Sequence, residues 1–533
     1  MKTYRYILSL FVSSLLLASC YQDLSTPARG EYAPIVLELS DDSDALTIGY
    51  GQTLKLSASA SQQGFSEDEL SYSWKMGVFV NSKYQDMQEI SDTKELSTLI
   101  VNTPSNDPYC LALTVSNVHD GYSVSKVWKL YVTSTLGDGL LVAHSRDGGE
   151  SSILSLVSAT PLTYGYTDEE PRVVDDVFGL ANGGKVIKGR VSNLLSRMTT
   201  YMDVPNPKSF SNYRVMVATE DTLRMLDPLQ YKEQECNEAL FQGSIRFQNF
   251  RADSLYNVAT CSSCAMVEGY MYACMEILDH CYTAVSCPFS PANVFTKANT
   301  SVVPASQGFI CLFNPNDKAI YSVHGVFIAQ SAMAKVEYPK APSAEFLADK
   351  EAVAAGCLEE NRNVFVLKDA EQKYWLVKLG INDNLNAEIV ELDLPEVDKA
   401  LGFTFCDNSK VFYYYTPDAI YTTVVNGSVV SARKLSFKPE NAAEKITMVK
   451  HYTQAWWGAG QSTVEDPSEL YYYAFPISTN RMQIIVVTYN ESTGEGKFYL
   501  KPYNVSTGMF SAFKDNGVYG GFGEISAVCS TLK

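Results

Sequence analysis

A cluster of thiols and one imidazole lies near the middle of the chain. It begins with a CxxC pair and consists of Cys261, Cys264, Cys274, His280, Cys281 and Cys287. Thiolate and imidazole are the ligands that a tetrahedral zinc ion prefers, so the group has the residue types of a metal site. A disulfide among these cysteines and a set of buried or free thiols are the alternatives. We favour thiols without metal, because Cys264 and Cys274 fall on or beside expected strands, where alternate side chains point into a core.

Residues suited to hydrolysis are sparse. The chain has five histidines, at 119, 144, 280, 324 and 451, and none begins an HExxH motif. A GxSxG elbow and a GxxxxGK[ST] loop are also missing from the sequence. His144 and Ser145 stand next to Asp147, but they lie at an expected hairpin turn where neighbouring side chains diverge. The sequence therefore predicts no catalytic residue, no metal ligand and no cofactor.

Two acidic runs have non-catalytic explanations as well as chemical ones. Asp175 and Asp176 contain one half of the carboxylate pair that a glycosidase needs. The run Asp41-Asp42-Ser43-Asp44 has the oxygen ligands of a calcium site. Solvated acidic loops account for both runs more simply, and we favour that interpretation.

Trp456 and Trp457 are the strongest candidates for binding. They are adjacent and are followed by Gly458 and Gly460 in an expected loop. An exposed indole offers a flat apolar face for a sugar ring or a partner protein. The alternative is that the two indoles pack inside the fold.

The first twenty residues have the features of a secretory signal. Lys2 and Arg5 precede an apolar run that ends in small residues and Cys20. The stretch Leu17-Ala18-Ser19-Cys20 resembles the lipobox of bacterial lipoproteins. That resemblance implies a lipoprotein signal over residues 1–20 that ends at Cys20. Cys20 would become the lipidated first residue of the mature chain and attach it to a membrane. An ordinary signal peptide with an incidental cysteine is the alternative.

Charge limits the classes of partner. The net charge is −18, and loss of the two cations of the signal lowers it to −20. An acidic surface repels phosphate backbones, so no nucleic acid partner is expected. Anionic lipid headgroups repel it too, so lipid must provide the attachment. No later apolar run reaches the roughly 18 residues that span a bilayer.

Strand signals divide the rest of the chain. Residues 21–32 are polar and form a tether. Residues 33–135 contain short alternating strands separated by turns, which predicts an immunoglobulin-like β-sandwich with Trp74 in its core. Tyr109, Leu111, Leu113 and Val115 are expected to share one face of a strand.

The lipobox, the sandwich strand from Tyr109 to Val115 and the stretch Gly137-Asp138-Gly139-Leu140-Leu141-Val142 together resemble the PKD-like lipoproteins of Bacteroidota. The resemblance covers most of the chain in its layout, and it supplies no catalytic residues. It implies a PKD-like sandwich, a propeller-like region and a role at the cell envelope beside nutrient-uptake systems.

Residues 136–533 contain a recurring hairpin, in which an apolar strand turns through polar residues into a second strand rich in aromatics. The first strands are 140–143, 215–218, 265–267, 309–312, 364–367, 403–406 and 484–487. A hairpin cannot bury its faces alone, so repeated hairpins favour radial closure. We predict an all-β chain in which a seven-bladed β-propeller follows the sandwich, with six or eight blades as alternatives. Asn426-Gly427 is expected to join the outer strands of the sixth blade.

The function that fits these features is a non-enzymatic binding or scaffolding accessory. It would be lipid-anchored at the outer membrane or cell surface, with a periplasmic orientation as the alternative, and its partner would be an envelope protein, peptide or glycan. A hydrolase or lyase that uses carboxylates at the propeller mouth is the second hypothesis.

Overall fold

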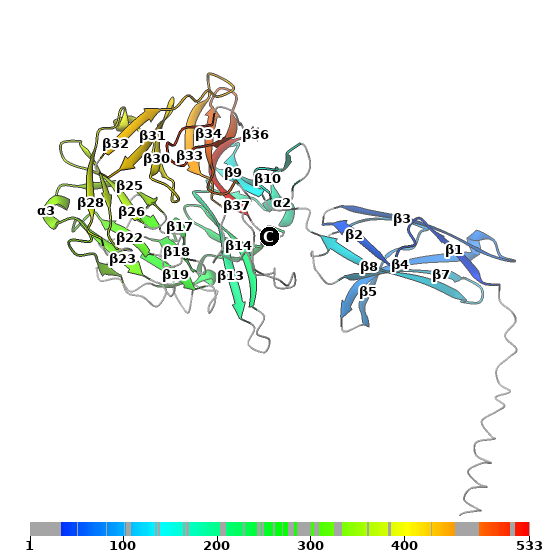
Figure 1. Cartoon of the computed structure of the whole chain (residues 1–533). Helices are drawn as coiled ribbons and strands as arrows, with labels where there is room; N and C mark the ends of the chain where they lie inside the picture. Colours follow the sequence, from blue (N-terminus) through cyan, green and yellow to red (C-terminus); the bar gives the residue numbers. More distant parts are fainter. Residues whose placement is uncertain are drawn as a thin grey trace, which may run out of the picture. The chain divides into compact units, whose positions relative to one another are not determined.

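The computed structural model divides the chain into two compact units, residues 1–135 (unit 1) and 136–533 (unit 2). The structure describes residues 33–50, 52–80, 83–100, 102, 108–133, 136, 139–163, 166, 170–202, 209–227, 230–241, 247, 250–259, 262–268, 270–275, 282–284, 300–302, 309–324, 333–359, 362–381, 385–427, 429–453, 479–511 and 517–531. Figure 1 shows both units.

Among its described residues, unit 1 has two sheets and one short 3-10 helix, Glu67–Glu69. The first sheet has the order β1-β3-β6, and the second has the order β2-β8-β7-β4-β5. The strands are β1 (Ile35–Leu39), β2 (Ala45–Gly49), β3 (Thr53–Gln62), β4 (Leu70–Val80), β5 (Lys83–Ser91), β6 (Glu95–Leu99), β7 (Tyr109–Asn117) and β8 (Ser123–Thr133).

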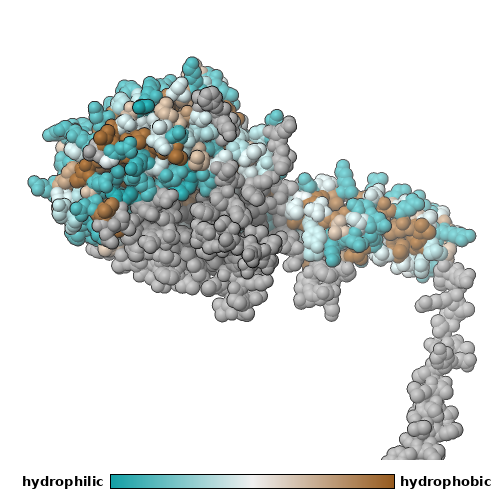
Figure 2. Space-filling model, in the orientation of Figure 1, coloured by the Kyte–Doolittle hydropathy of each residue, from teal (hydrophilic) through white to brown (hydrophobic). Residues whose placement is uncertain are grey.

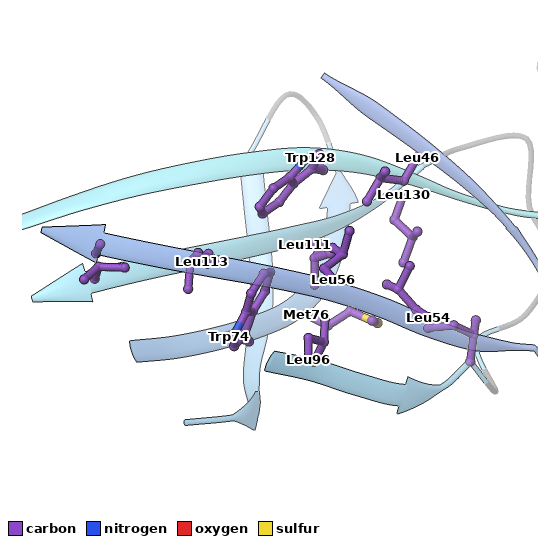
Figure 3. Close-up of a cluster of buried hydrophobic side chains, with 14 of the residues drawn as sticks. Leu46, Leu54, Leu56, Trp74, Met76, Leu96, Leu111, Leu113, Trp128 and Leu130 are labelled. Atoms are coloured by element: carbon purple, nitrogen blue, oxygen red, sulfur yellow. The ribbon is translucent and has the colours of Figure 1, made fainter. Parts of the chain in front are cut away.

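The core of unit 1 follows from alternation along its strands. In β3 every second residue is buried, so Leu54, Leu56 and Ala58 point inward while their neighbours face solvent. Leu111 and Leu113 of β7 join the same cluster, as the sequence pattern predicts. Figure 3 shows Leu54, Leu56, Leu111 and Leu113 among the strands that carry them.

Trp74 lies at the centre of this core, which confirms the expected position of that residue. It is fully buried on β4, and its ring stacks on Trp128 of β8 at 5.7 Å between centroids. Its indole N–H donates to the carbonyl of Thr93 at 2.8 Å, so the polar atom of the buried ring is satisfied.

Unit 2 contains seven sheets among its described residues. Their orders are β11-β10-β9-β37 with β12 beside β10, then β13-β14-β15-β16, β17-β18-β19-β20, β21-β22-β23-β24, β25-β26-β27-β28, β29-β30-β31-β32 and β33-β34-β35-β36. The strands of the first three sheets are β9 (Gly139–Ser145), β10 (Ser151–Ser158), β11 (Arg172–Val174), β12 (Ile187–Lys188), β13 (Asn193–Met202), β14 (Ser209–Ala218), β15 (Leu223–Leu226), β16 (Glu233–Cys236), β17 (Ala252–Ala259), β18 (Ser262–Val267), β19 (Tyr270–Met275), β20 (Thr283–Ala284) and β37 (Glu524–Thr531).

The remaining strands are β21 (Thr300–Val302), β22 (Phe309–Asn314), β23 (Ala319–His324), β24 (Ala334–Lys335), β25 (Glu351–Leu358), β26 (Arg362–Lys368), β27 (Tyr374–Lys378), β28 (Glu388–Leu392), β29 (Gly402–Phe405), β30 (Val411–Thr416), β31 (Ala419–Asn426), β32 (Val429–Lys434), β33 (Lys445–His451), β34 (Gln483–Asn490), β35 (Glu495–Pro502) and β36 (Val518–Phe522). The helices α2 (Val177–Ala181) and α3 (Ala344–Leu347) and the 3-10 turns Asn237–Leu240 and Val397–Lys399 are short.

The sheets of unit 2 follow one another in a circle. From β13 onward, the first strand of each sheet packs against the first strand of the next, in the order β13, β17, β21, β25, β29 and β33. The last strand of the chain, β37, pairs with β9, packs on β13 and also packs on β34 and β35. The circle is therefore closed by the C-terminal strand, and the arrangement is propeller-like (Figure 1).

Most described residues on the second strand of each sheet are buried, because both faces of the strand are covered. Along β26, Val364 and Val366 join a cluster with β30, whereas Phe365 and Leu367 join a cluster with β22. These strands therefore read as continuous apolar runs rather than as alternating ones. That property is why the hairpins of unit 2 are visible in the sequence.

The described structure confirms that the chain is almost entirely β. Six of the seven hairpins expected from the sequence are the second and third strands of their sheets. The hairpin at 403–406 is different, since it joins the first strand β29 to the second strand β30. Asn426-Gly427 joins β31 to β32, as expected.

On the side shown in Figure 2, hydrophilic residues cover most of the described surface and hydrophobic residues form smaller patches. Among the described residues, no helix is long and apolar enough to cross a membrane.

Candidate functional site

The connection between β33 and β34 is the candidate binding element. Its central part, residues 454–478, contains Trp456 and Trp457 and lies outside the described residues, as does Cys20. The structure describes the chain up to Thr453 and again from Thr479, so both ends of this segment are defined.

Backbone hydrogen bonds join the two ends of the segment. The amide of Tyr452 donates to the carbonyl of Gln483 at 2.9 Å, and the amide of Arg481 donates to the carbonyl of Tyr452 at 3.0 Å. The ladder of β33 and β34 therefore continues past His451 to the point where the described chain stops.

Residues from other sheets hold the same ends. The hydroxyl of Thr479 donates to the carbonyl of Pro161 at 2.8 Å, and the hydroxyl of Ser530 donates to the carbonyl of Thr453 at 2.9 Å. Pro161 follows β10, and Ser530 belongs to β37. The segment thus begins and ends on a base built from the first and last sheets of the circle.

A buried polar network contacts the residues that form this base. The imidazole of His451 is 3.1 Å from the hydroxyl of Tyr503 through Nε2 and 3.5 Å from Asp407 through Nδ1. Nε of Arg481 donates to the same carboxylate of Asp407 at 3.0 Å. Burial lowers the pKa of His451, so the imidazole is neutral at physiological pH.

Asn408 completes this network. Its side-chain amide donates to the carbonyl of Arg481 at 2.9 Å, and its side-chain oxygen accepts from Tyr503 at 3.1 Å. Arg481 is thereby held through both its side chain and its backbone, three residues after the segment ends. The network has no motif that a sequence search would find, because its members lie at the end of β33, in the β29–β30 turn, just before β34 and just after β35.

A second polar cluster lies where the circle closes. It brings together His144 and Asp175, which are 31 positions apart in the sequence. The hydroxyl of Ser155 lies between them, 2.9 Å from Nε2 of His144 and 2.6 Å from Asp175. Arg146 donates to the other oxygen of Asp175 at 3.0 Å.

The direction of these hydrogen bonds decides what the cluster can do. The amide of Gly523 donates to Nδ1 of His144 at 3.1 Å, so the proton of the neutral ring is on Nε2. His144 therefore donates to Ser155, and Ser155 donates to Asp175. A nucleophilic serine needs the opposite order, in which the hydroxyl donates to an unprotonated imidazole nitrogen.

Electrostatics supports this assignment. Burial, together with the nearby Arg146, lowers the pKa of His144 to about 4. Burial raises the pKa of Asp175, but its bonds with Ser155 and Arg146 outweigh burial and leave the pKa below its ordinary value. A neutral imidazole, a hydroxyl and a carboxylate thus form one relay that joins β9 and β10 to Asp175, next to β11.

Other candidate residues from the sequence serve turns and caps. The carboxylate of Asp147 accepts from the hydroxyls of Ser145 and Ser151, at 2.7 and 2.5 Å, within the β9–β10 turn. Asp176 caps α2 by accepting from the amide of Gly179 at 2.9 Å. Asp175 and Asp176 therefore have separate local partners in the described structure.

The cysteine cluster is divided between faces of one sheet. Cys264 pairs with Ala273 and packs in the cluster with Leu312, whereas Cys274 pairs with Ser263 and packs in the cluster with Met216. Both thiols are buried, and burial raises the pKa of Cys264. Cys261, His280, Cys281 and Cys287 lie outside the described residues. Within the part of the chain that the structure describes, no group of three or more metal-ligating side chains is found.

The acidic run in unit 1 has a cation of its own. Nζ of Lys126 lies 3.0 Å from the carboxylate of Asp42 and 3.6 Å from that of Asp44, and it also donates to the carbonyl of Asp42. The carboxylates that could have been calcium ligands are therefore paired with a lysine ammonium.

Comparison with known proteins gives only remote similarities. No protein-family model matches the chain, and no curated protein matches it. A quinoprotein alcohol dehydrogenase-like protein from Bacteroides thetaiotaomicron has a TM-score of 0.48 at 11% identity, covering 94% of this chain and 99% of that one. AztD from Citrobacter koseri has a TM-score of 0.34 at 10% identity, covering 87% and 98%.

The extracellular domain of a one-component system from Bacteroides thetaiotaomicron has a TM-score of 0.32 at 10% identity, covering 92% of this chain and 70% of that one. These values are too low to assign a family or a function to the chain.

Proposed function

We propose that the chain is an envelope lipoprotein, attached through Cys20, that acts as a non-enzymatic binding or scaffolding accessory. Trp456 and Trp457 are its proposed contact residues for a glycan or peptide beside an uptake system. The observation that carries the proposal is the anchored base of residues 454–478, whose two ends are held by the first and last sheets of unit 2.

The proposed contact residues lie in the part of the chain that joins β33 to β34. Binding residues are often found between strands, on segments that a scaffold of packed sheets positions. The segment places two adjacent indoles after the inner strand β33, and indoles are frequent anchors of interfaces. Arg481 and Thr479 fix its exit in the described structure, so its contacts would start from a defined position.

The finer fold assignment belongs to the same proposal. We assign unit 1 to an immunoglobulin-like, PKD-like sandwich that acts as a spacer, and unit 2 to a seven-bladed propeller. The two facing sheets of unit 1 and the closed circle of seven described sheets support this assignment. The outer faces of unit 1 also suit a spacer, since they carry small hydroxyl residues such as Ser57, Ser59 and Ser125.

The experiment uses the lipid-free chain, residues 33–533, on a glycan array and in a pull-down from solubilised envelopes. The double variant Trp456→Ala/Trp457→Ala is expected to lose at least about tenfold in affinity for the ligand that the wild type binds, as hot-spot indoles do. Tyr338→Ala is the control, because Tyr338 is an aromatic that is 74% exposed and belongs to the stretch before β25, outside residues 454–478.

If Tyr338→Ala lost as much affinity as the double variant, Trp456 and Trp457 would not be the contact residues. If the wild type instead cleaves a glycan or peptide and loses that activity when a carboxylate is changed, that result favours the alternative function, a hydrolase or lyase.

A further inference from the structure

The described chain enters unit 1 at one end of its two sheets. Ile35, the first residue of β1, pairs with Gln62, the last residue of β3. The side chain of Gln62 donates to the carbonyl of Ala33 at 2.9 Å and accepts from the side chain of Asn117 at 2.8 Å. Because Asn117 ends β7, the turns after β3 and after β7 both lie at this end, which we call the entry end.

Exposed apolar and aromatic side chains lie on these two turns. Phe65 belongs to the turn after β3 and is 37% exposed, whereas Val118 and Tyr122 belong to the β7–β8 turn and are 58% and 39% exposed. The amide of Val118 donates to the carbonyl of Glu69 at 3.0 Å. The ring of Phe65 stacks on that of His119 at 6.3 Å between centroids. Phe65, Val118 and Tyr122 thus stand on two turns that contact each other, and we call them the apolar tip.

The composition of the tip is unusual for its place in the fold. Turns are usually built from glycine and small polar residues, because these residues suit turn geometry and water. A single exposed hydrophobic residue needs no explanation, but a group of them indicates a surface that meets another apolar phase. The question is which partner lies within reach of the entry end.

The chain leaves unit 1 at the opposite end. β8 begins at Ser123, beside the tip, and ends at Thr133. Thr133 pairs with Gly49 and accepts a hydrogen bond from the amide of Tyr50 at 2.8 Å. The ten steps along this strand cover about 33 Å. The tip is therefore at the end of unit 1 that leads back along the chain to Cys20, and unit 2 follows the other end.

The length of the chain limits how far the tip can be from the proposed lipid. Ala33 is thirteen residues after Cys20. A fully extended chain covers at most about 3.6 Å per residue, so Ala33 stays within about 47 Å of Cys20. A link this short can give an effective concentration in the millimolar range. A contact with the bilayer that is too weak for the unattached chain can therefore form in the attached one.

The charges beside the tip determine which lipid surface fits. The turns 63–69 and 118–122 contain Glu67, Asp68, Glu69 and Asp120 but no lysine or arginine. Lys94 pairs with Glu67 at 3.0 Å, which leaves an excess of carboxylates at the entry end. Anionic headgroups would repel this surface. A zwitterionic headgroup layer carries no net charge and leaves the apolar contact unopposed.

We propose that the apolar tip lies on the zwitterionic phospholipid surface to which the chain is attached. Phe65 and Val118 enter the boundary between headgroups and acyl chains. Tyr122 suits the headgroup level, where its ring is in an apolar layer and its hydroxyl is hydrated. The contact holds the entry end of unit 1 at the bilayer and directs the other end of the unit away from it. The inference rests on the proposed attachment through Cys20.

The test replaces the lipid by a tag, so that it does not depend on acylation of Cys20. Residues 21–533 carry an N-terminal hexahistidine tag and bind phosphatidylcholine vesicles that contain a nickel-chelating lipid. Vesicle flotation measures the dissociation constant. Phe65→Ser/Val118→Ser is expected to bind about tenfold more weakly than the wild type, because the tag contact is unchanged while two apolar side chains no longer leave water.

The matched control is Leu99→Ser/Val429→Ser, which removes two apolar side chains that are 57% and 67% exposed. Leu99 pairs with Thr53 at the start of β3, the end of that strand opposite the tip, and Val429 belongs to unit 2. The dissociation constant of this control is expected within about twofold of the wild type. Circular dichroism verifies that each variant is folded.

Hydrogen exchange measured by mass spectrometry locates the contact. Peptides that cover residues 63–69 and 117–123 are expected to exchange more slowly when the tagged wild type is on vesicles than when it is free. The tip variant is expected to lose this protection.

Equal affinities of the wild type and the tip variant, or an equal loss in the control, overturn the proposal. Tighter binding when phosphatidylglycerol replaces part of the phosphatidylcholine also overturns it, because anionic lipid is expected to weaken the contact. Dimers that form without vesicles and depend on Phe65 and Val118, measured by analytical ultracentrifugation, would assign the tip to a second copy of the chain instead. These outcomes do not depend on acylation of Cys20 or on ligand binding by Trp456 and Trp457, so failure of the tip is distinct from failure of the proposed function.

Discussion

Ser155 connects an imidazole to a carboxylate inside the first sheet of unit 2. Its hydroxyl accepts from His144 and donates to Asp175, and its side chain is fully buried. In Ser155→Ala, the Nε2 proton of His144 loses its partner in a buried site. We expect the free energy of unfolding to fall by about 1–3 kcal/mol. Hydrogen exchange measured by mass spectrometry on peptides of β9 and β10 reads this change within unit 2.

Ser431→Ala is the control for that measurement, because Ser431 is exposed on the outer strand β32. Its effect is expected within about 0.5 kcal/mol of zero. If Ser155→Ala exchanges no faster than Ser431→Ala, the relay contributes nothing to the closure of the circle.

His144 also makes the stability of unit 2 depend on pH. The folded pKa of about 4 lies below the ordinary value of 6.5, so the unfolded chain takes up a proton first as pH falls. Stability from this group is complete above pH 6.5 and is lost as pH falls toward 4. Between pH 7 and pH 5 the loss is about 2 kcal/mol. Urea denaturation of the wild type and of His144→Gln at both pH values measures it.

The expected result is a smaller drop in stability between pH 7 and pH 5 for His144→Gln than for the wild type. The variant keeps part of the drop, because burial lowers the pKa of His451 in the same direction. Identical drops in the two proteins would show that His144 does not titrate as the structure requires.

These residues show what sequence reasoning finds at the smallest scale. It identified His144 and Asp175 by type but missed Ser155, which links them. Ser155 stands inside an apolar run, where a serine has no distinguishing pattern. Only the register of β9 against β10, with Ile153 opposite His144, places that hydroxyl beside the imidazole.

At the scale of elements, the inner strands pack so closely that one position excludes a side chain. A Cβ added at Gly356 of β25 would lie 2.2 Å from the ring of Phe405 on β29. The ring would have to move, and overpacking of this kind costs about 1–3 kcal/mol. We expect Gly356→Ala to lower the urea midpoint of unit 2, and Phe405→Leu to recover part of the loss in the double variant.

Gly520→Ala provides the comparison, since its added Cβ meets only the flexible side chains of Glu495 and Lys497, at 3.2 Å or more. A Gly356→Ala protein as stable as the Gly520→Ala protein would mean that β25 and β29 are further apart than described.

Strands differ in how much of them the sequence reveals. Second strands such as β26 and β34 are buried on both faces, so their apolar runs predict them directly. First strands such as β25 are partly exposed and carry small residues, EAVAAGCL, so no hairpin was predicted there. The first strand β29 is an exception. Phe403 and Phe405 make it unusually apolar, so the sequence pattern predicts the hairpin β29–β30 there.

At the scale of the whole molecule, closure of the circle depends on strands at opposite ends of unit 2. β37 pairs with β9, and Val528 lies opposite Val142 although almost 400 residues separate them in sequence. Repeated hairpins predict that neighbours must cover one another, but they do not show which strand completes the first sheet. That pairing arises from tertiary packing and carries no local signal.

The proposed attachment to a membrane is a prediction that belongs to the whole molecule. If the proposed signal is removed, the remaining chain has a net charge of −20, which anionic headgroups repel, and no described helix is long and apolar enough to span a bilayer. Acyl chains on Cys20 would supply the binding energy, at about 0.8 kcal/mol for each buried CH₂. In Cys20→Ala we therefore expect the protein to move from the detergent phase to the aqueous phase in Triton X-114 partitioning, and to lose incorporation of labelled palmitate.

Cys236→Ala is the control, because it changes an exposed cysteine at the end of β16 and is expected to stay in the detergent phase. Retention of Cys20→Ala in the detergent phase, or an unmodified Cys20 at the mature N-terminus by mass spectrometry, would show that something other than lipid on this cysteine attaches the chain.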